Sequence, residues 1–225
     1  MTGNGGGLEE AIGTICHRNN IAHLKLVEFK LEYPRDEDQS DRGHIRYIHI
    51  LPNNLKKVVD SYEDERQEIR RKDGSGGEHD IRESNSEYLL GVTSNVILKD
   101  GTSKHMFFLD FDCDVCGENL TKVRHLLEIY NVTPGFIVLS GRSYHFYSVK
   151  LYEEKEWIEM LKDIDWPDKG LIDVNDEVLE KIGLQSIVDK IWLRNQIYNR
   201  YSTLRLSRNL TCKTVKPYVL EAIDL

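Results

Sequence analysis

The strongest restriction on the fold comes from residues 104–112, KHMFFLDFD, where an apolar run ends in two aspartates. β-strand alternation divides these residues between two faces, with Phe107, Leu109 and Phe111 on one and Phe108, Asp110 and Asp112 on the other. The two carboxylates then point the same way from Cα atoms roughly 7 Å apart, and their oxygens can converge on one cation or bridge two. Like charges beside a buried strand are costly without such compensation. We interpret the segment as a strand that ends in a cation site; ordinary surface aspartates at an exposed strand end are the alternative.

A β-α-β unit is predicted around this strand. The run 88–98 and the turn pair Asp100-Gly101 predict a β-hairpin that leads into it. Apolar residues then recur at helical spacing over 120–130, and a Pro-Gly turn leads to a further strand over 136–139. We expect the strands on either side of the helix to be adjacent and parallel.

The rest of the chain is expected to mix helices and strands. The expected helices cover 8–15, 54–71, 153–164 and 177–191, and the expected strands cover 23–33, 45–50 and 144–152, with two more in 201–209 and 215–220. The polar, Gly/Ser-rich segment 72–86 is expected to be flexible. We therefore expect an α/β (α+β) protein with an N-terminal α/β module over 1–86 packed on an RRM-like module over 87–225, the two forming one catalytic domain.

Composition excludes several classes of protein. Of the 225 residues, 40% are hydrophobic, 30% are charged and only 5 are Pro, so the chain is neither disordered nor fibrous. No run approaches the roughly 18 apolar residues of a membrane span, and there is no export signal, so we expect a cytoplasmic protein without a membrane partner. A net charge of −8 argues against a protein that coats duplex DNA by charge.

A second cluster of polar side chains follows the predicted strand 136–139. Its members can hold phosphate oxygens: Ser140, Gly141 as a sharp turn, Arg142, Ser143 and His145. A Ser-x-His pair alone is more often structural than functional. Because this pair follows the two aspartates after one predicted helix, it predicts a phosphate site beside the cation site.

A third cluster is basic and lies between residues 191 and 217. It contains no acidic residue and six cations: Arg194, Arg200, Arg205, Arg208, Lys213 and Lys216. Tyr198 and Tyr201 lie among them. Such a segment can follow a nucleic-acid backbone or grip a triphosphate; a basic edge that offsets the acidic remainder is the alternative.

Together these segments resemble a known family. FFLDFD, SGRSYH and YSTLRLSRN are similar, in type and order, to the Asp-x-Asp strand, the Ser-x-His strand and the Leu-Arg strand of the archaeo-eukaryotic primase superfamily, which includes primase-polymerases. The similarity extends over 107–209, and the N-terminal segment would complete the family's core. The resemblance implies an archaeo-eukaryotic primase-like fold and a template-dependent nucleotidyltransferase that joins nucleoside triphosphates with release of pyrophosphate.

The resemblance also implies roles for individual residues. Asp110, Asp112 and a third carboxylate would hold two Mg²⁺ or Mn²⁺ ions, roughly 3.5 to 4 Å apart in such sites. Asp189 is our choice for the third, and Asp173 is the competitor. The incoming nucleotide would contact Ser140, Gly141, Arg142, Ser143, His145 and Arg205. The nucleic acid would contact Arg200, Tyr201 and Arg208.

The implied partners are a single-stranded DNA or RNA template and an NTP or dNTP. Because the chain is small and acidic, a helicase or an accessory primase subunit would add grip on the template. No zinc is expected, since Cys113 and Cys116 form a lone C-x-x-C without a second ligand pair nearby in sequence.

Two other functions fit part of the pattern. A haloacid-dehalogenase-like phosphatase would use Asp110 as nucleophile, Asp112 as general acid and Ser140 as phosphate ligand. However, the Lys and the acidic strand that it needs later in the chain are not found. A non-catalytic RRM-like module would stack bases on Phe108, Tyr144 and Phe146, but its two sheet carboxylates would repel phosphate.

Overall fold

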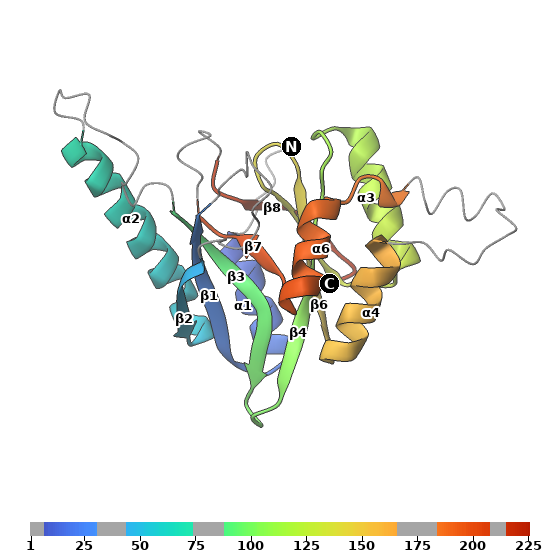
Figure 1. Cartoon of the computed structure of the whole chain (residues 1–225), viewed down its shortest axis with the longest axis horizontal. Helices are drawn as coiled ribbons and strands as arrows, with labels where there is room; N and C mark the ends of the chain where they lie inside the picture. The colour runs from blue at the N-terminus through green and yellow to red at the C-terminus, as the bar shows by residue number, and fades with distance from the viewer. Residues whose placement is uncertain (1–6, 31–43, 74–87, 166–183, 208–214) are drawn as a thin grey trace, which may run out of the picture.

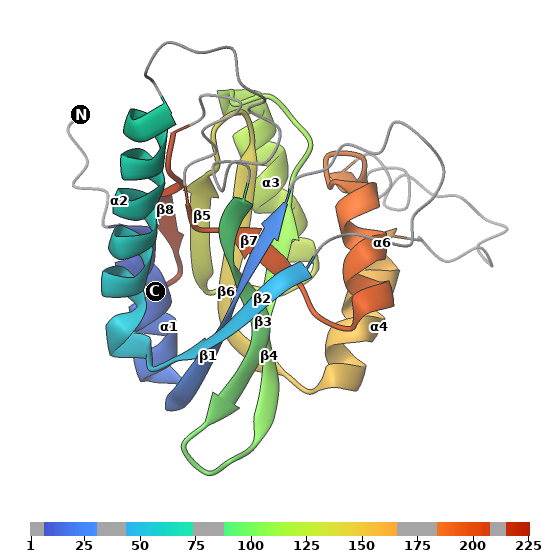
Figure 2. The ribbon, with the colours of Figure 1, turned by 60° about the vertical axis from the view of Figure 1, so that its left-hand side comes forward.

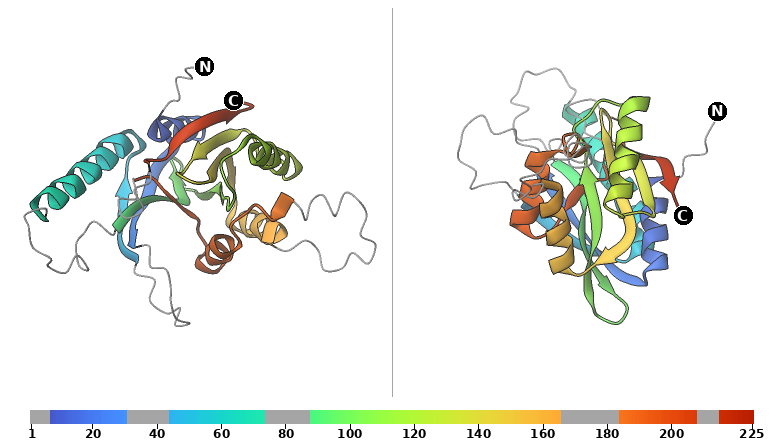
Figure 3. Two further views of the ribbon diagram at one scale, coloured as in Figure 1. Left: turned by 90° about the horizontal axis from the view of Figure 1, so that it is seen from above. Right: turned by 90° about the vertical axis from the view of Figure 1, so that its right-hand side faces the viewer.

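The computed structural model describes residues 7–30, 44–73, 88–165, 184–207 and 215–225. Its centre is a sheet with helices on both faces (Figure 1). Helices α1 and α2 lie on one face, and α3, α4 and α6 lie on the other, as the view from above shows (Figure 3). This is the mixed α/β fold expected from the sequence.

The elements agree with most of the predicted ones to within a few residues. The helices are α1 (Leu8–Arg18), the 3-10 turn η1 (Pro52–Asn54), α2 (Leu55–Asp73), α3 (Gly117–Ile129), α4 (Glu154–Asp165) and α6 (Lys190–Asn199). The strands are β1 (Ile21–Lys30), β2 (His44–Ile50), β3 (Tyr88–Leu98), β4 (Ser103–Asp110), β5 (Gly135–Leu139), β6 (Tyr144–Tyr152), β7 (Thr203–Arg205) and β8 (Tyr218–Ile223). Of the segment 72–86, residues 72 and 73 end α2 and the others lie outside the described residues.

A single antiparallel sheet connects the two ends of the chain. The strand order is β2-β1-β3-β4-β6-β5-β8, and β7 pairs with β3 beside this path. Because β1 pairs with β3, the sheet crosses the expected module division at residue 86. That division remains a prediction.

The sheet splits near the predicted cation site. Strand β3 pairs with β4 only close to their hairpin, where Asn95–Ile97 face Ser103–His105. Farther along, β3 pairs instead with β7, through Gly91–Thr93 (Figure 2). The last residues of β4 are therefore free to pair with another segment.

The expected parallel neighbours β4 and β5 are not adjacent. Strand β6 lies between them and is antiparallel to both. The reason is the four-residue connection 140–143, which can only return the chain as an antiparallel hairpin. This hairpin places β6, with His145, directly beside Asp110.

The predicted alternation along 106–111 is confirmed by the two cores. Met106 and Phe108 belong to the core between the sheet and α1 and α2. Phe107, Leu109 and Phe111 belong to the core under α3, α4 and α6. Each face of β4 is thus buried, as both sides of a central strand require. No helix of the described ranges has the length and apolar character of a membrane-spanning helix.

The predicted helix over 177–191 is interrupted in its described part, where 184–185 and 190–191 are helical and the residues between them are not. Residues 186–189 are not helical: Val188 forms a bridge with Phe111, and α6 begins at Lys190. Asp189 is the N-cap, since its Oδ1 accepts a hydrogen bond from Trp192 N at 2.8 Å. Apolar periodicity could not show this break, because a buried extended segment and a buried helix share the same composition. Residues 177–183 lie outside the described ranges.

Candidate active site

The candidate site centres on Asp110, the last residue of β4. Asp110 pairs in register with His145 of β6, and His145 Nε2 lies 3.4 Å from Asp110 Oδ1. The Asp110 side chain is 25% exposed and that of His145 only 6%. The predicted pair of acid and imidazole is therefore together, at a place where a ligand can reach the carboxylate.

Burial governs the protonation of both groups. It raises the pKa of Asp110 to about 8, with further increases from the Asp189 and Asp112 carboxylates and an opposing effect of Arg205. It lowers the pKa of His145 to about 3, and the Arg205 charge adds to this effect. At neutral pH the imidazole is uncharged and Asp110 carries a proton, so their contact is not an ion pair. The Asp189 and Asp112 carboxylates together outweigh the Arg205 charge in their effect on the Asp110 pKa.

Asp189 reaches the site through a short extended segment. Asp189 N donates to Asp110 O at 3.0 Å, and Asp112 N donates to Ile187 O at 2.8 Å. Residues 187–189 thus pair with the end of β4, where β3 no longer pairs with it. Two segments far apart in sequence bring three aspartates together, with Asp112 exposed. Asp173 lies outside the described residues.

The connection 140–143 is tied to the strand end. Ser140 N donates to Ser143 O at 3.0 Å, and Gly141 has φ +110°, a conformation that favours glycine. The Ser143 hydroxyl donates to Phe111 O and accepts from Cys113 N. Ser143 therefore holds the connection beside the aspartates, whereas Arg142 is exposed.

Arg205 spans the split in the sheet. It lies on β7, and its guanidinium donates to Ser140 O on one side and to Ser207 O on the other, the latter at 2.7 Å. The same charge acts on Asp110 and His145. The structure thus brings the predicted Leu-Arg strand to the two earlier clusters.

The residues predicted to contact nucleic acid are less closely grouped. Arg200 Nη1 forms an ion pair with Glu154 Oε1 at 3.1 Å. Tyr201 forms a hydrogen bond with Tyr47. Arg208 lies outside the described residues.

Sequence analysis missed Tyr147. Its ring centroid lies 6.4 Å from that of His145, and its hydroxyl is buried without a hydrogen-bond partner in the described structure. Burial raises its pKa. The available signal was its position two residues after His145, which places both side chains on one face of β6.

The three aspartates suit a divalent cation by their chemistry but not by their present geometry. Carboxylate oxygens are the ligands that Mg²⁺ and Mn²⁺ prefer, and a cation would relieve the repulsion that raises the Asp110 pKa. Their present positions do not form a finished cage: within the described ranges, no three His, Cys, Asp or Glu side chains converge enough to hold a metal. Asp189 Oδ1 is engaged by the α6 cap. Binding would therefore require side-chain rotation, which the exposed Asp112 can make.

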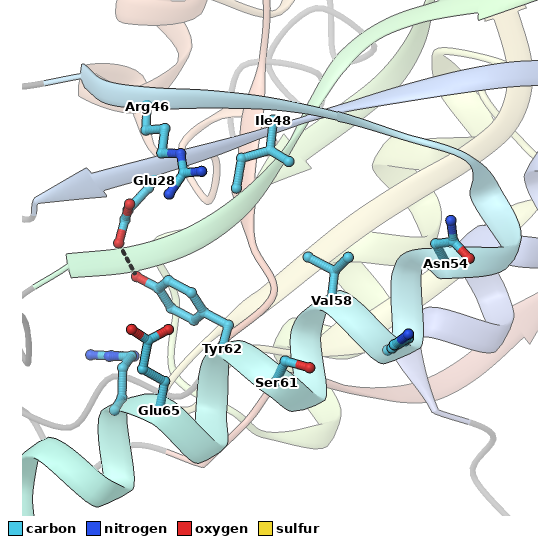
Figure 4. A pocket seen from close by; sticks show the side chains of 10 residues that line it. Glu28, Arg46, Ile48, Asn54, Val58, Ser61, Tyr62 and Glu65 are labelled. Carbon is cyan, nitrogen blue, oxygen red and sulfur yellow. Dashed lines mark hydrogen bonds between the residues drawn. The ribbon is translucent and has the colours of Figure 1, made fainter.

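A pocket of about 540 Å³ lies elsewhere, between α2 and the outer strands β1 and β2 (Figure 4). Tyr62 OH donates to Glu28 Oε1 at 3.1 Å along its wall, and Arg46 faces them from β2. It shares no lining residue with the group around Asp110. Volume alone therefore does not identify the candidate site.

Comparison with known families agrees with the geometry. The profile of the AEP-like family, described as archaeo-eukaryotic primase 1D-like, matches residues 74–218, more than half of the chain. The chain belongs to this family. The match favours the primase-like interpretation over the dehalogenase-like phosphatase. A search of curated proteins found no match.

Solved structures with a similar fold include two of primase RepB′. The catalytic domain of primase RepB′, crystallised in complex with initiator DNA, aligns with a TM-score of 0.50 at 8% identity, covering 95% of this chain and 84% of that one. A second structure of primase RepB′ aligns with a TM-score of 0.49 at 8% identity, covering 95% of this chain and 56% of that one. At this identity the first likeness shows the fold of a primase catalytic domain.

Proposed function

We propose that the chain is a template-dependent nucleotidyltransferase of the primase-polymerase type, which joins nucleoside triphosphates and releases pyrophosphate. The observation that carries this proposal is the meeting of Asp110, Asp189 and Arg205 at the split in the sheet. A site with excess carboxylate next to an arginine suits a cation-bound triphosphate. Family membership supports the same chemistry.

In this proposal Asp110, Asp112 and Asp189 hold two Mg²⁺ or Mn²⁺ ions. When bound, these ions would activate the attacking 3′-hydroxyl and steady the triphosphate and the departing pyrophosphate. Asp110 must lose its proton to serve as a ligand, and its raised pKa makes ion binding compete with protonation.

The nucleotide phosphates would lie along the connection 140–143 and β7. His145 stays neutral and can offer one N–H to a phosphate oxygen, so it binds rather than accepts a proton. Arg205 would exchange its carbonyl contact with Ser140 for the stronger charged contact with phosphate. Ser140, Gly141, Arg142 and Ser143 would complete this site.

The substrate would include a single-stranded template. The similar RepB′ catalytic domain was crystallised with initiator DNA, and the basic segment after α6 offers charge for such a strand.

Primer extension tests the proposal. The protein is incubated with a single-stranded template, with and without primer, Mn²⁺ and labelled NTPs or dNTPs. Wild type is expected to form products that a chelator abolishes. The Asp110→Ala, Asp112→Ala double variant should lose at least about 100-fold in rate, because several kcal/mol of charge stabilisation is removed.

Asp114→Asn is the matched control, since Asp114 is an exposed aspartate of the same loop to which no role is assigned. It should keep wild-type activity. Absence of product from wild type, or unchanged product from the double variant, contradicts the proposal. Strand binding that ignores metal, without synthesis, would support the RRM-like binding module instead.

A further inference from the structure

Two tyrosines and a lysine from distant parts of the chain meet on the N-terminal half of the sheet. Tyr47 OH and Tyr201 OH are 2.8 Å apart, and their rings meet edge to face with centroids 6.4 Å apart. Lys25 Nζ lies 3.9 Å from the Tyr47 ring centroid and 5.5 Å from that of Tyr201. Tyr47 nevertheless remains 42% exposed.

This group, the Tyr47 cluster, lies on the sheet face turned away from α1 and α2. Leu24 and Leu26 point into the core beneath those helices, so Lys25 between them points to the opposite face. The register pairs Val27 with Tyr47 and Lys25 with His49, which places Tyr47 and His49 on the face of Lys25.

On this face, the described residues of β1 and β2 carry no carboxylate. Glu28 is the only acidic residue of β1 in the described structure, and its bond to Tyr62 of α2 places it on the other face. Strand β2 has no acidic residue. In a chain of net charge −8, two neighbouring strands that present a lysine, histidines and the exposed Tyr47 ring on this face, and no carboxylate, have the chemistry that matches a polyanion with bases.

We propose that the Tyr47 cluster binds a single-stranded nucleic acid, with the Lys25 ammonium on a backbone phosphate and the Tyr47 ring stacked on a base. The proposal rests on the proposed function, in which this strand is the template. Rings stack on any base, so such a contact suits a strand of varying sequence.

The cluster is connected to the candidate active site by β7. Tyr201 is followed by Thr203–Arg205, and four residues of chain span at most about 14 Å, so Arg205 lies within that distance of Tyr201. The cluster is thus close to Arg205, whereas Asp110 lies with Phe108 on the face of the sheet that α1 and α2 cover. Arg200, by contrast, is already paired with Glu154.

A structural role would predict a different mutational pattern. If the cluster only fastens the segment after α6 to β2, the hydroxyl bond between Tyr47 and Tyr201 is the important contact. Tyr47→Phe would then be harmful. If the ring binds a base, Tyr47→Phe is tolerated and Tyr47→Ala is not.

Binding of labelled oligonucleotides about 16 nucleotides long, measured by fluorescence anisotropy without nucleotide or metal, tests the inference. The arms are single-stranded DNA, single-stranded RNA and a DNA duplex. Tyr47→Ala should weaken single-strand binding about tenfold, as expected for a lost base stack, and Tyr47→Phe should bind within about twofold of wild type. Lys25→Met should reduce the slope of log affinity against log salt by about 0.7, the value for one phosphate contact on a single strand.

Tyr218→Ala is the matched control, because Tyr218 is 46% exposed on β8 at the opposite edge of the sheet. It should bind as wild type does. Failure of wild type to bind single strands, equal binding by Tyr47→Ala, or loss in Tyr47→Phe overturns the inference. If wild type binds with the predicted pattern but synthesises nothing, the binding surface is supported and the proposed function is wrong. If wild type synthesises product but Tyr47→Ala binds as well as wild type, the proposed function is supported and the binding surface is wrong.

Discussion

Asp110 is the residue on which the candidate site depends. Its surroundings disfavour the ionised form: burial and two further carboxylates raise its pKa, and Arg205 offsets only part of this effect. Such local destabilisation is typical of functional sites, where stability is sacrificed for binding.

This arrangement predicts that Asp110→Asn stabilises the metal-free protein. The pKa of Asp110 rises to about 8 on folding, from about 3.9 in an unfolded chain. Between these values the folded state holds a proton that the unfolded state has released, so stability falls as pH rises through this window. In a chelator at pH 8 the variant should melt at least about 3 °C higher than wild type, which corresponds to about 1 kcal/mol.

The difference in melting temperature should shrink toward pH 5, where wild-type Asp110 is protonated. Added Mn²⁺ should raise the melting temperature of wild type more than that of the variant. Differential scanning fluorimetry measures both effects. A variant that melts lower than wild type at pH 8 contradicts the assigned environment, and Asp114→Asn, at an exposed position of the following loop, serves as the control.

At the residue scale, the sequence alone predicted the common strand face of Asp110 and Asp112 and the Ser-x-His pair that contains His145. Strand alternation is sufficient for this, because it relates neighbours in the chain. The sequence could not predict the raised pKa of Asp110, which depends on burial and on Asp189, 79 positions later. Tyr147 was missed for the same reason: its burial depends on its tertiary surroundings.

At the scale of the elements, Asp189 has two roles at the first turn of α6. Asp189 caps the helix through Trp192 N and lies next to Asp110 through its own backbone N–H. A stability effect of mutation there could therefore be mistaken for a catalytic one.

Two substitutions at Asp189 distinguish its role as a helix cap from its role as a carboxylate beside Asp110. Asp189→Asn keeps a good cap but removes the charge that raises the Asp110 pKa, so we expect a stability no lower than that of wild type and loss of polymerisation. Asp189→Ala removes both and should also cost about 1 kcal/mol of unfolding free energy. Urea unfolding and primer extension measure the two properties; wild-type activity in Asp189→Asn would limit Asp189 to capping.

Strand β5 depends on a glycine where it meets β6. A Cβ at Gly135 would lie 2.6 Å from Tyr147 O and would also clash with the Phe146 ring. Gly135→Ala should therefore destabilise the protein by about 2 kcal/mol, typical of overpacking. Gly117→Ala at the start of α3 meets nothing within 4 Å and should cost nothing. Equal stability of the two variants in urea would show that the β5–β6 contact can relax.

Elements with a clear local pattern were well predicted, as α1, α2, α4 and β6 show. The segment around 186–189 was not, because its conformation depends on pairing with β4 rather than on its own periodicity. The predicted hairpin of β3 and β4 was confirmed, but the predicted parallel neighbour β5 was wrong, since strand order is decided by connections and burial on both faces.

At the scale of the whole molecule, one sheet carries both parts of the candidate site, Asp110 at the end of β4 and His145 on β6. Strands β4 and β6 are central, and β2 and β8 are the edges. The first six residues of β6 are buried without interruption, whereas exposure alternates along β8.

Hydrogen exchange should follow this gradient. Central backbone amides open only with global unfolding, whereas edge strands open locally at lower free energy. We expect peptides from β4 and β6 to exchange at least about tenfold more slowly than peptides from β8, as measured by mass spectrometry. Equal rates would indicate that the sheet opens as one unit.

Local sequence alone settles the strand character of 104–111, its two faces, the acid pair at its end and the order of motifs that resembles a primase. These depend on residues a few positions apart, whose side chains are related by strand or helix geometry. Tertiary structure alone decides that β6 rather than β5 lies beside β4, that Asp189 joins the aspartates, and that Lys25 and Tyr47 meet Tyr201. Those contacts join segments whose separation no local periodicity records, and they form because the sheet must bury both faces at once.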